Sequence, residues 1–261
     1  MPQRLPRPHR ADRRVEHRFD TDAVRTQWPR LHALDAEPLP DREDVLAAWA
    51  LFHSGAFEQA EAAGLRAGAA GMAVANRAAS AYATLLEPRE TVRLALYRQI
   101  AARARAQASE HPQQASAWYW HGRTLARYAQ GVRMARALAQ GIGTRLHGAL
   151  EATLALAPAH AFAHAALGGF HAQVIEQVGP LIGAMSYGVS AERALWHLRE
   201  AERLAPDSAA VLMEHAAALL MLEGEARLGE ATRLQEQAAA IQPRDAAERL
   251  WVELARASLA L

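Results

Sequence analysis

Proline recurs at the ends of alanine-rich segments, and this feature constrains the fold more than any other. The segments Ser-Glu-His-Pro112, Ala-Leu-Ala-Pro158, Arg-Leu-Ala-Pro206 and Ala-Ile-Gln-Pro243 are each followed by a new helical pattern within about three residues. Proline cannot continue a helical hydrogen-bond ladder, so it ends one helix and allows the next to turn back. An internal repeat of this kind predicts a solenoid of antiparallel helix pairs.

The composition excludes several classes of protein. The chain has 261 residues, 51% of them hydrophobic, which is enough for one elongated domain. The net charge of +1 gives no case for nucleic-acid binding, and the absence of cysteine excludes disulfides and thiolate metal sites. No apolar run approaches the roughly 18 residues of a membrane span, and the N-terminus lacks the apolar core of a secretory signal. We therefore expect a cytoplasmic protein, whose alanine- and arginine-rich, lysine-free composition is typical of a bacterial genome.

Residues 1–40 differ from the rest of the chain. Over residues 1–19 six arginines face only Asp12 and Glu16, and prolines are interleaved among them. Such a segment buries too little apolar surface to offset the entropy of ordering it. We expect a disordered basic tail; a weak contact with an anionic surface is the alternative.

Residues 41–261 are predicted to form the folded domain. Val45, Trp49 and Phe52 fall on one face of a first helix that follows the acidic residues at 41–44. No segment alternates with period two for long enough to indicate a strand, so the chain is predicted to be all-α. Further helices are expected at about 57–68, 72–86, 89–110, 114–130, 144–157, 159–178, 189–205, 207–223, 227–241 and 244–259.

The pairs of helices resemble the tetratricopeptide repeat (TPR) family. Its first helix carries a large residue, a small residue and an aromatic, and its second helix carries spaced alanines and a closing proline. The resemblance implies an α–α superhelix of about five helical pairs over residues 41–260, with a C-terminal capping helix from Asp245. The residues that carry it are Gly55 to Ala60, Trp118, Gly122, Leu150, Leu154, Leu167, Gly168, Ala194, Leu198, Ala201, Ala216, Leu219, Leu228, Ala231 and Ala238.

Two repeats are longer than the family pattern, because they contain insertions at 130–143 and 174–188. The pattern is similar to uncharacterised bacterial TPR proteins and, more weakly, to the helical domain of the regulator of microtubule dynamics family. Apolar residues in the second insertion would be costly to leave in water. We expect them to pack back on the solenoid; a lid over an apolar ligand or contact with a membrane surface are alternatives. These residues are Val178, Leu181, Ile182, Met185 and Tyr187.

The resemblance also implies a concave groove in which a partner binds. Arg123 and Arg127 lie one helical turn apart, so both could point at one carboxylate. The alternative is that the groove side chains simply fill a closed superhelix. The groove residues by position are Val45, Trp49, Phe52, His53, Tyr119, Arg123, Arg127, Phe162, Ala165, Gln173, Met213, Leu220 and Met221.

Histidines suggest a metal site, but packing roles are expected instead. His160 and His164 are one turn apart, which suits imidazole ligation, yet no carboxylate stands at metal spacing beside them. We expect His160, His164 and His171 to be buried and structural, and His121 and His215 to pack or to bind backbone groups. No metal and no cofactor are predicted.

These patterns favour a non-enzymatic scaffold that binds a peptide or another protein in the groove. The alternative is a protein that binds a small apolar ligand beneath the insertions. An enzyme is the least expected class, because no set of titratable residues converges in the sequence.

Overall fold

The computed structural model describes residues 18–133, 137 and 140–260. Within these ranges all regular structure is helical, as predicted for an all-α chain. Short 3₁₀ turns lie at Gly68–Gly71 and Gly224–Arg227, and a π turn lies at Tyr82–Leu86. The α-helices are α1 (Thr21–Leu31), α2 (Glu43–His53), α3 (Phe57–Arg66), α4 (Met72–Ala81), α5 (Glu90–Glu110), α6 (Ala115–Gln130), α8 (Ile142–Leu156), α9 (Ala161–Val178), α10 (Pro180–Tyr187), α11 (Ala191–Leu204), α12 (Ala209–Glu223), α13 (Leu228–Ala240) and α14 (Ala246–Leu259).

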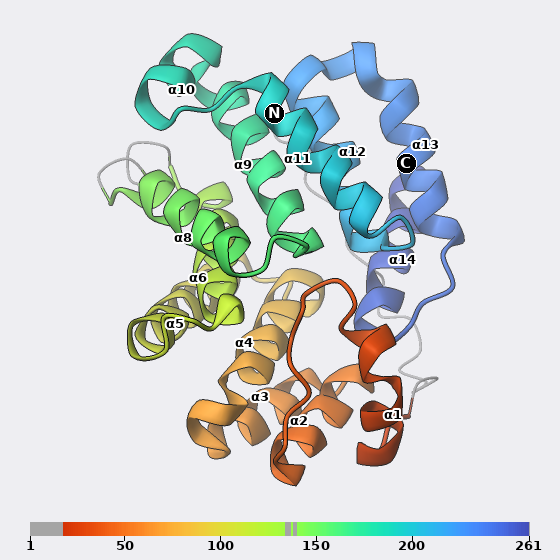
Figure 1. The fold of residues 1–261 in the computed structure, drawn as a ribbon. Helices are drawn as coiled ribbons and strands as arrows, with labels where there is room; N and C mark the ends of the chain where they lie inside the picture. The colour runs from red at the N-terminus through yellow and green to blue at the C-terminus, as the bar shows by residue number, and fades with distance from the viewer. Residues whose placement is uncertain (1–17, 134–136, 138–139, 261) are drawn as a thin grey trace.

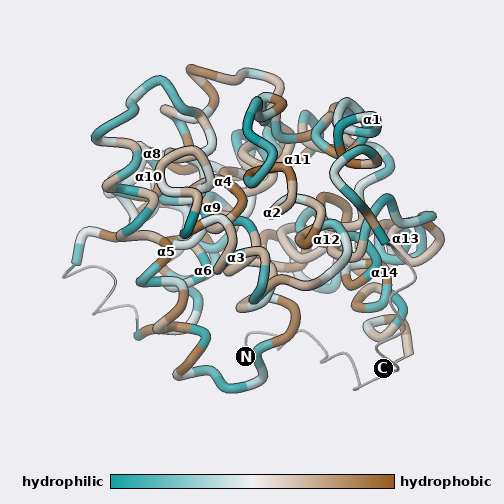
Figure 2. Tube along the Cα trace, turned by 90° about the horizontal axis from the view of Figure 1, so that it is seen from below, coloured by the Kyte–Doolittle hydropathy of each residue, from teal (hydrophilic) through white to brown (hydrophobic). Residues whose placement is uncertain are grey.

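The recurring prolines separate consecutive helices, as the sequence predicts. Pro112, Pro158, Pro206 and Pro243 lie in the short connections that follow α5, α8, α11 and α13. Most helices pack against the next one in the chain, and each shows both hydrophilic and hydrophobic residues along its length (Figure 2). Most helices bury one face against a neighbour, whereas α9 and α12 are buried on several sides and α10 buries little.

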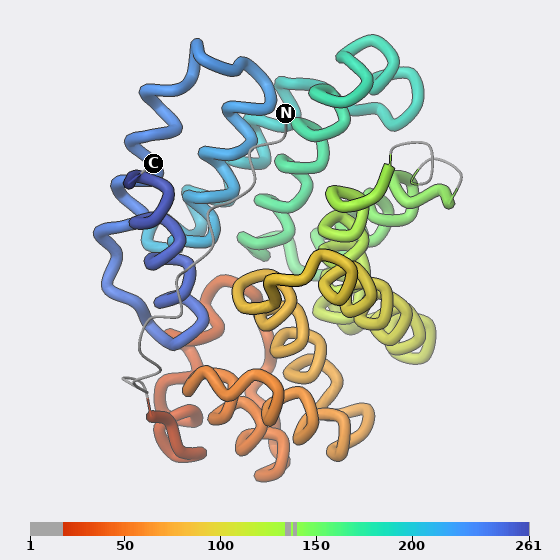
Figure 3. Tube along the Cα trace, turned by 180° about the vertical axis from the view of Figure 1, so that it is seen from behind, coloured from red at the N-terminus to blue at the C-terminus, as the bar shows by residue number. Residues whose placement is uncertain are grey.

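The helices run around the molecule in chain order and return to their starting point. Figure 1 shows α1–α4 at the bottom, α5, α6 and α8 on the left, α9–α11 at the top and α12–α14 on the right, and Figure 3 shows the same circuit from behind. Helix α14 contacts α12 and α13 and also α2. The predicted C-terminal cap thus meets the N-terminal part of the chain, and we call this arrangement the helical ring.

Two glycines let neighbouring helices of the ring approach closely. A Cβ atom added at Gly122 would lie 2.8 Å from Leu150 Cγ, and one at Gly168 would lie 2.5 Å from Leu198 Cγ. A real Cβ atom cannot approach other heavy atoms to that distance without displacing them. The small residues predicted for these positions are therefore explained by helix packing, between α6 and α8 and between α9 and α11.

The prediction of a disordered tail over residues 1–40 is wrong for residues 18–40. Asp20 caps α1 by accepting a hydrogen bond from the backbone of Ala23 at 2.7 Å. Val24, Trp28 and Leu31 of α1 are buried, and the Trp28 ring meets Trp49 of α2 edge-on at 5.6 Å. This apolar face offsets the cost of ordering the segment. Residues 1–17 lie outside the described residues.

Candidate functional site

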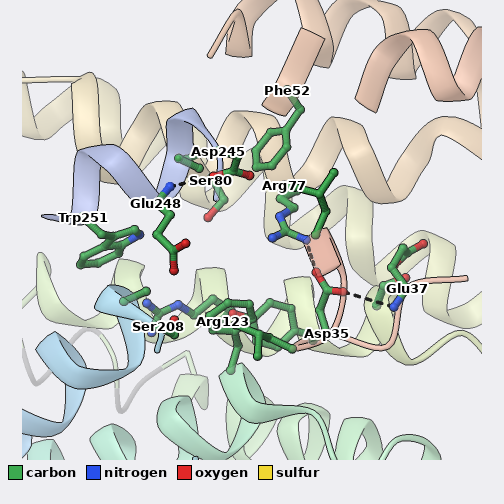
Figure 4. Close-up of a pocket in the computed structure, with 18 of the residues that line it drawn as sticks. Asp35, Glu37, Phe52, Arg77, Ser80, Arg123, Ser208, Asp245, Glu248 and Trp251 are labelled. Atoms are coloured by element: carbon green, nitrogen blue, oxygen red, sulfur yellow. Dashed lines mark hydrogen bonds and ion pairs between the residues drawn. The ribbon is translucent and has the colours of Figure 1, made fainter. Parts of the chain in front are cut away.

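A partly enclosed cavity of about 130 Å³ lies inside the helical ring. A water molecule needs about 10–15 Å³ of such space, so the cavity has room for on the order of ten waters or a ligand of similar size. Its walls come from both ends of the chain and from the middle, because the ring brings α2, α4, α6, α12 and α14 together around it. Figure 4 shows Arg77, Arg123, Glu248 and Trp251 around this space.

Aromatic side chains form much of the wall. They are Trp49, Phe52, Tyr119, Trp120, Phe162 and Trp251. Aromatic rings supply large contact areas with little conformational freedom, and pockets that bind small molecules are lined mainly by such groups with a few polar atoms among them.

The arginines of the wall are each paired with a carboxylate. Arg77 donates to Asp35, and Arg244 donates to Glu248 through Nε and NH2, both at 2.9 Å. Burial alone would raise the pKa of Asp35, but Arg77 and His32 together hold it well below its usual range. Such bidentate and charge-assisted bonds fix the arginines in place before any ligand binds.

Arg123 and Arg127 do converge on one carboxylate, and that carboxylate belongs to the same chain. Arg123 of α6 donates to both oxygens of Glu214 on α12, at 2.6 and 3.2 Å, and Arg127 donates to Oε1. Burial opposes ionisation of Glu214, but the two guanidiniums lower its pKa to about 2. Both arginines are largely buried and paired with Glu214, although Arg127 Nε has no hydrogen-bond partner among the described residues.

A series of four buried side chains in close contact links the N-terminal and C-terminal parts of the helical ring. His32 Nδ1 lies 3.1 Å from Asp35 Oδ1, the Nε2 atoms of His32 and His53 are 3.3 Å apart, and His53 Nδ1 lies 2.7 Å from Asp245 Oδ2. Burial lowers the pKa of His32 to about 4. Burial would raise the pKa of Asp245, but His53, the Glu248 backbone and Arg77 together lower it to about 2. This series of side chains connects α2 to the N-cap of α14 and so closes the helical ring.

Several donors in the wall have no hydrogen-bond partner within the described residues, and two of them are His160 Nε2 and the Tyr119 hydroxyl. His160 is the N-cap of α9, and its Nδ1 accepts a bond from the backbone of Ala163 at 3.2 Å. Neutral imidazole then carries its proton on Nε2, and burial favours this neutral form by lowering the pKa to about 4. The Tyr119 hydroxyl, whose ring centroid lies 4.5 Å from that of His160, is the second donor.

Most of the predicted groove residues are buried in the structure. Trp49, Phe52, Tyr119, Arg123 and Phe162 line the cavity. Val45, His53, Ala165, Gln173 and Met213 are buried elsewhere, Arg127 is held by Glu214, and Leu220 and Met221 are half-buried. Of these residues, five therefore line the central cavity, Gln173 lines a second one, and the others pack in the interior or are half-buried.

The predicted ligand lid divides into two parts. Residues 180–187 form helix α10, which begins with Pro180 and ends at Gly188 in the left-handed region, with φ 65°. Val178 and Tyr187 line a second cavity of about 40 Å³, but Leu181, Ile182 and Met185 are 73%, 57% and 82% exposed. The expectation that the insertion packs back on the solenoid is therefore wrong for these three side chains. The insertion at 130–143 lies partly outside the described residues.

The predicted packing roles of the histidines are confirmed. His160, His164 and His171 are buried. His121 Nδ1 bonds the Ala101 carbonyl at 2.8 Å, and His215 Nδ1 lies 2.9 Å from Glu202 Oε2. Within the described ranges, histidine and acidic side chains form no group of three placed to hold a metal ion.

Several residues of the cavity escape prediction from the sequence. Asp35 and Glu37 lie in the segment expected to be disordered, and Arg244 and Glu248 suggest only an ordinary helix start. Arg77 offers the clearest missed signal, because it stands in a stretch of otherwise small and apolar residues that includes Ala73, Val74, Ala78 and Ala79. A charge within an apolar helix indicates a buried partner.

No protein-family model matches the chain, and no curated protein matches its sequence. In the part of the chain that the structure describes, no helix is both long enough and apolar enough to cross a bilayer.

Proposed function

We propose that this protein is a non-catalytic binding protein that holds a small ligand in the central cavity. The proposal is carried by the composition of the cavity wall: every arginine of the wall is already paired with a carboxylate, and these pairs lie among aromatic rings. The donors of Tyr119 and His160 have no partner among the described residues of the wall. Charges that are already neutralised need no rearrangement when a ligand enters, and the free donors would orient a hydrogen-bond acceptor on the ligand.

A small ligand is a better fit than the extended peptide of the scaffold hypothesis. The side chains expected to contact a peptide are buried against each other, and Arg123 and Arg127 are occupied by Glu214. A peptide could present one side chain or one chain end to the cavity, but an extended segment would have to separate helices. The TPR-like superhelix remains our interpretation of the ring, supported by its helix pairs and by the glycines at close helix contacts.

The absence of catalysis is also a proposal. Asp35, Glu214 and Glu248 are neutralised by arginine, and burial keeps His32 and His160 neutral by lowering their pKa values to about 4. Glu37, whose pKa is raised to about 7, is the one described wall residue in the range that a general acid or base needs, and we propose that it binds a charged group instead, because these paired or neutral groups cannot act as its proton-transfer partner.

Tryptophan fluorescence offers a direct test, because Trp49, Trp120 and Trp251 line the cavity. The probes are phenethyl alcohol, phenylacetate and phenethylammonium, which share one aromatic ring and differ in charge. We expect at least one to change the emission saturably. The change should be lost in Ala210→Phe, which fills the cavity, and kept in Ala102→Phe, which adds the same ring on the exposed side of α5. Absence of binding by all three probes, or equal binding by both variants, would refute the proposal.

A further inference from the structure

The charged side chains that line the cavity do not balance. The wall contains three arginines (Arg77, Arg123 and Arg244) and four carboxylates (Asp35, Glu37, Asp245 and Glu248). Arg77 pairs with Asp35 and Arg244 with Glu248, Arg123 shares Glu214 with Arg127, and Asp245 is hydrogen-bonded to His53. Glu37 is left over: no basic side chain of the described residues forms an ion pair with it.

Glu37 is held firmly in position. Its backbone N–H donates to Asp35 Oδ1 at 3.2 Å, and its carbonyl accepts from Trp28 Nε1 at 2.9 Å. Ser116 of α6, which also lines the cavity, lowers the pKa of the Glu37 side chain. The backbone of Glu37 is thus fixed at the wall, and the Ser116 hydroxyl is a neutral neighbour of its carboxylate.

The surroundings of Glu37 disfavour its negative charge in the empty cavity. Burial and then the neighbouring Asp35 raise its pKa to about 7, and Arg77 on α4 offsets this only in part. His160, at the start of α9, also lines the cavity, and burial keeps it neutral by lowering its pKa to about 4. A buried carboxylate is usually paired with a positive charge. A positive group placed against Glu37 would supply that counter-charge.

Aromatic rings lie in the same cavity wall as this carboxylate. Ser116 and Trp120 are one helical turn apart and therefore share a face of α6, and Tyr119 packs against Trp120 with ring centroids 4.8 Å apart. The faces of tryptophan and tyrosine rings attract cations. A carboxylate with aromatic rings in the same wall is suited to an ammonium group on an apolar body.

We propose that the ligand of the central cavity is a small organic cation whose ammonium group binds Glu37 and whose apolar body packs on Trp120 and Tyr119. This inference rests on the proposed function and specifies the class of ligand. An anionic ligand fits less well, because Arg77, Arg123 and Arg244 already hold carboxylates.

The experiment compares phenethylammonium with phenethyl alcohol at about pH 8, where Glu37 is ionised, using tryptophan fluorescence and calorimetry. We expect the ammonium to bind at least about tenfold more tightly than the alcohol. Glu37→Gln should abolish that difference while leaving the affinity for the alcohol within about twofold, whereas the exposed Glu225→Gln should leave the difference intact. Circular dichroism verifies that both variants fold.

Lowering the pH gives a second signature. Between about pH 8 and pH 6 the affinity for phenethylammonium should fall about tenfold, because Glu37 takes up a proton, while the affinity for the alcohol should stay constant. Equal affinities for the two probes, or an ammonium preference that survives Glu37→Gln, would overturn the inference and leave ligand binding standing. Failure of all three phenyl probes to bind would instead refute the proposed function itself.

Discussion

Acidification to about pH 5 should strongly destabilise this protein, because it contains buried histidines that are neutral when folded. His171 and His197 are buried with pKa values lowered to about 4 and about 3, and burial is the main cause in both; His32 and His160 have values of about 4. An unfolded histidine titrates near pH 6.5. The unfolded chain therefore binds more protons than the folded chain as the pH falls from about 6.5 to 4. The stability that depends on neutral histidines is lost over this pH range and is fully present above it.

The magnitude follows from these shifts. At pH 5.5 each of the four histidines costs between about 1 and 2 kcal/mol, together roughly 6 kcal/mol. Glu37 acts in the opposite direction: its pKa is raised to about 7, so protonation of this carboxyl in the folded state stabilises the protein by about 2 kcal/mol. The net loss is about 4 kcal/mol at pH 5.5 and about 8 kcal/mol at pH 4.5, which is comparable to the whole stability of a typical domain.

Urea denaturation followed by circular dichroism between about pH 7.5 and pH 4.5 measures this loss. His171→Gln should reduce the loss between pH 7.5 and 5.5 by about 1–2 kcal/mol, because glutamine can accept the Ser190 backbone bond but cannot titrate. His111→Gln, at an exposed histidine, should not change it. A free energy of unfolding that is constant from pH 7.5 to 5.5 would show that the buried histidines do not resist protonation, and would refute the reasoning.

Three substitutions test the packing and pairing of the ring by urea denaturation. Glu214→Leu should cost about 3–5 kcal/mol, because two buried guanidiniums lose their counter-charge, and a cost below 1 kcal/mol would contradict the pairing. Gly168→Ala should cost about 1–3 kcal/mol through its clash with Leu198, whereas Gly148→Ala, with no atom within 4 Å of the new Cβ, should be neutral or stabilising. Asp245→Asn should cost about 1–3 kcal/mol and speed hydrogen exchange in α14, since it weakens the bond to His53; unchanged exchange would argue against ring closure through this pair.

The helices that the sequence predicts are those marked by strong local signals. Pro158 and Pro206 end helices through backbone chemistry that needs no tertiary context. Helix α1 is missed because the charge and proline content of residues 1–17 dominates the average over the segment, although Val24, Trp28 and Leu31 have helical spacing. Helix α10 is missed because Gly179 and Pro180 indicate a loop when taken alone, yet they also suit the first positions of a helix.

The cavity could not be predicted, because its charged pairs join segments that are distant in the chain. Arg77 and Asp35 are 42 residues apart, and His53 and Asp245 are 192 apart. Helical periodicity identifies which face of a helix is apolar, but the closing of the ring depends on the angles between many successive helices. Small differences in those angles decide whether α14 meets α2 or leaves an open groove.

Arg123 and Arg127 show most clearly how far the sequence alone can predict a site. Their spacing correctly predicts that both guanidiniums approach one carboxylate, because arginines one turn apart on a largely buried face need a shared negative charge. The spacing does not indicate where that charge comes from, and the chain supplies it from Glu214, 91 residues beyond Arg123. The same principle governs the rest of the cavity: where the fold pairs a charge internally, that charge is unavailable to a ligand. Recognition of a ligand must then depend on the groups that the fold leaves unpaired. Among the described charged residues of the cavity wall, the one without an ion pair is Glu37.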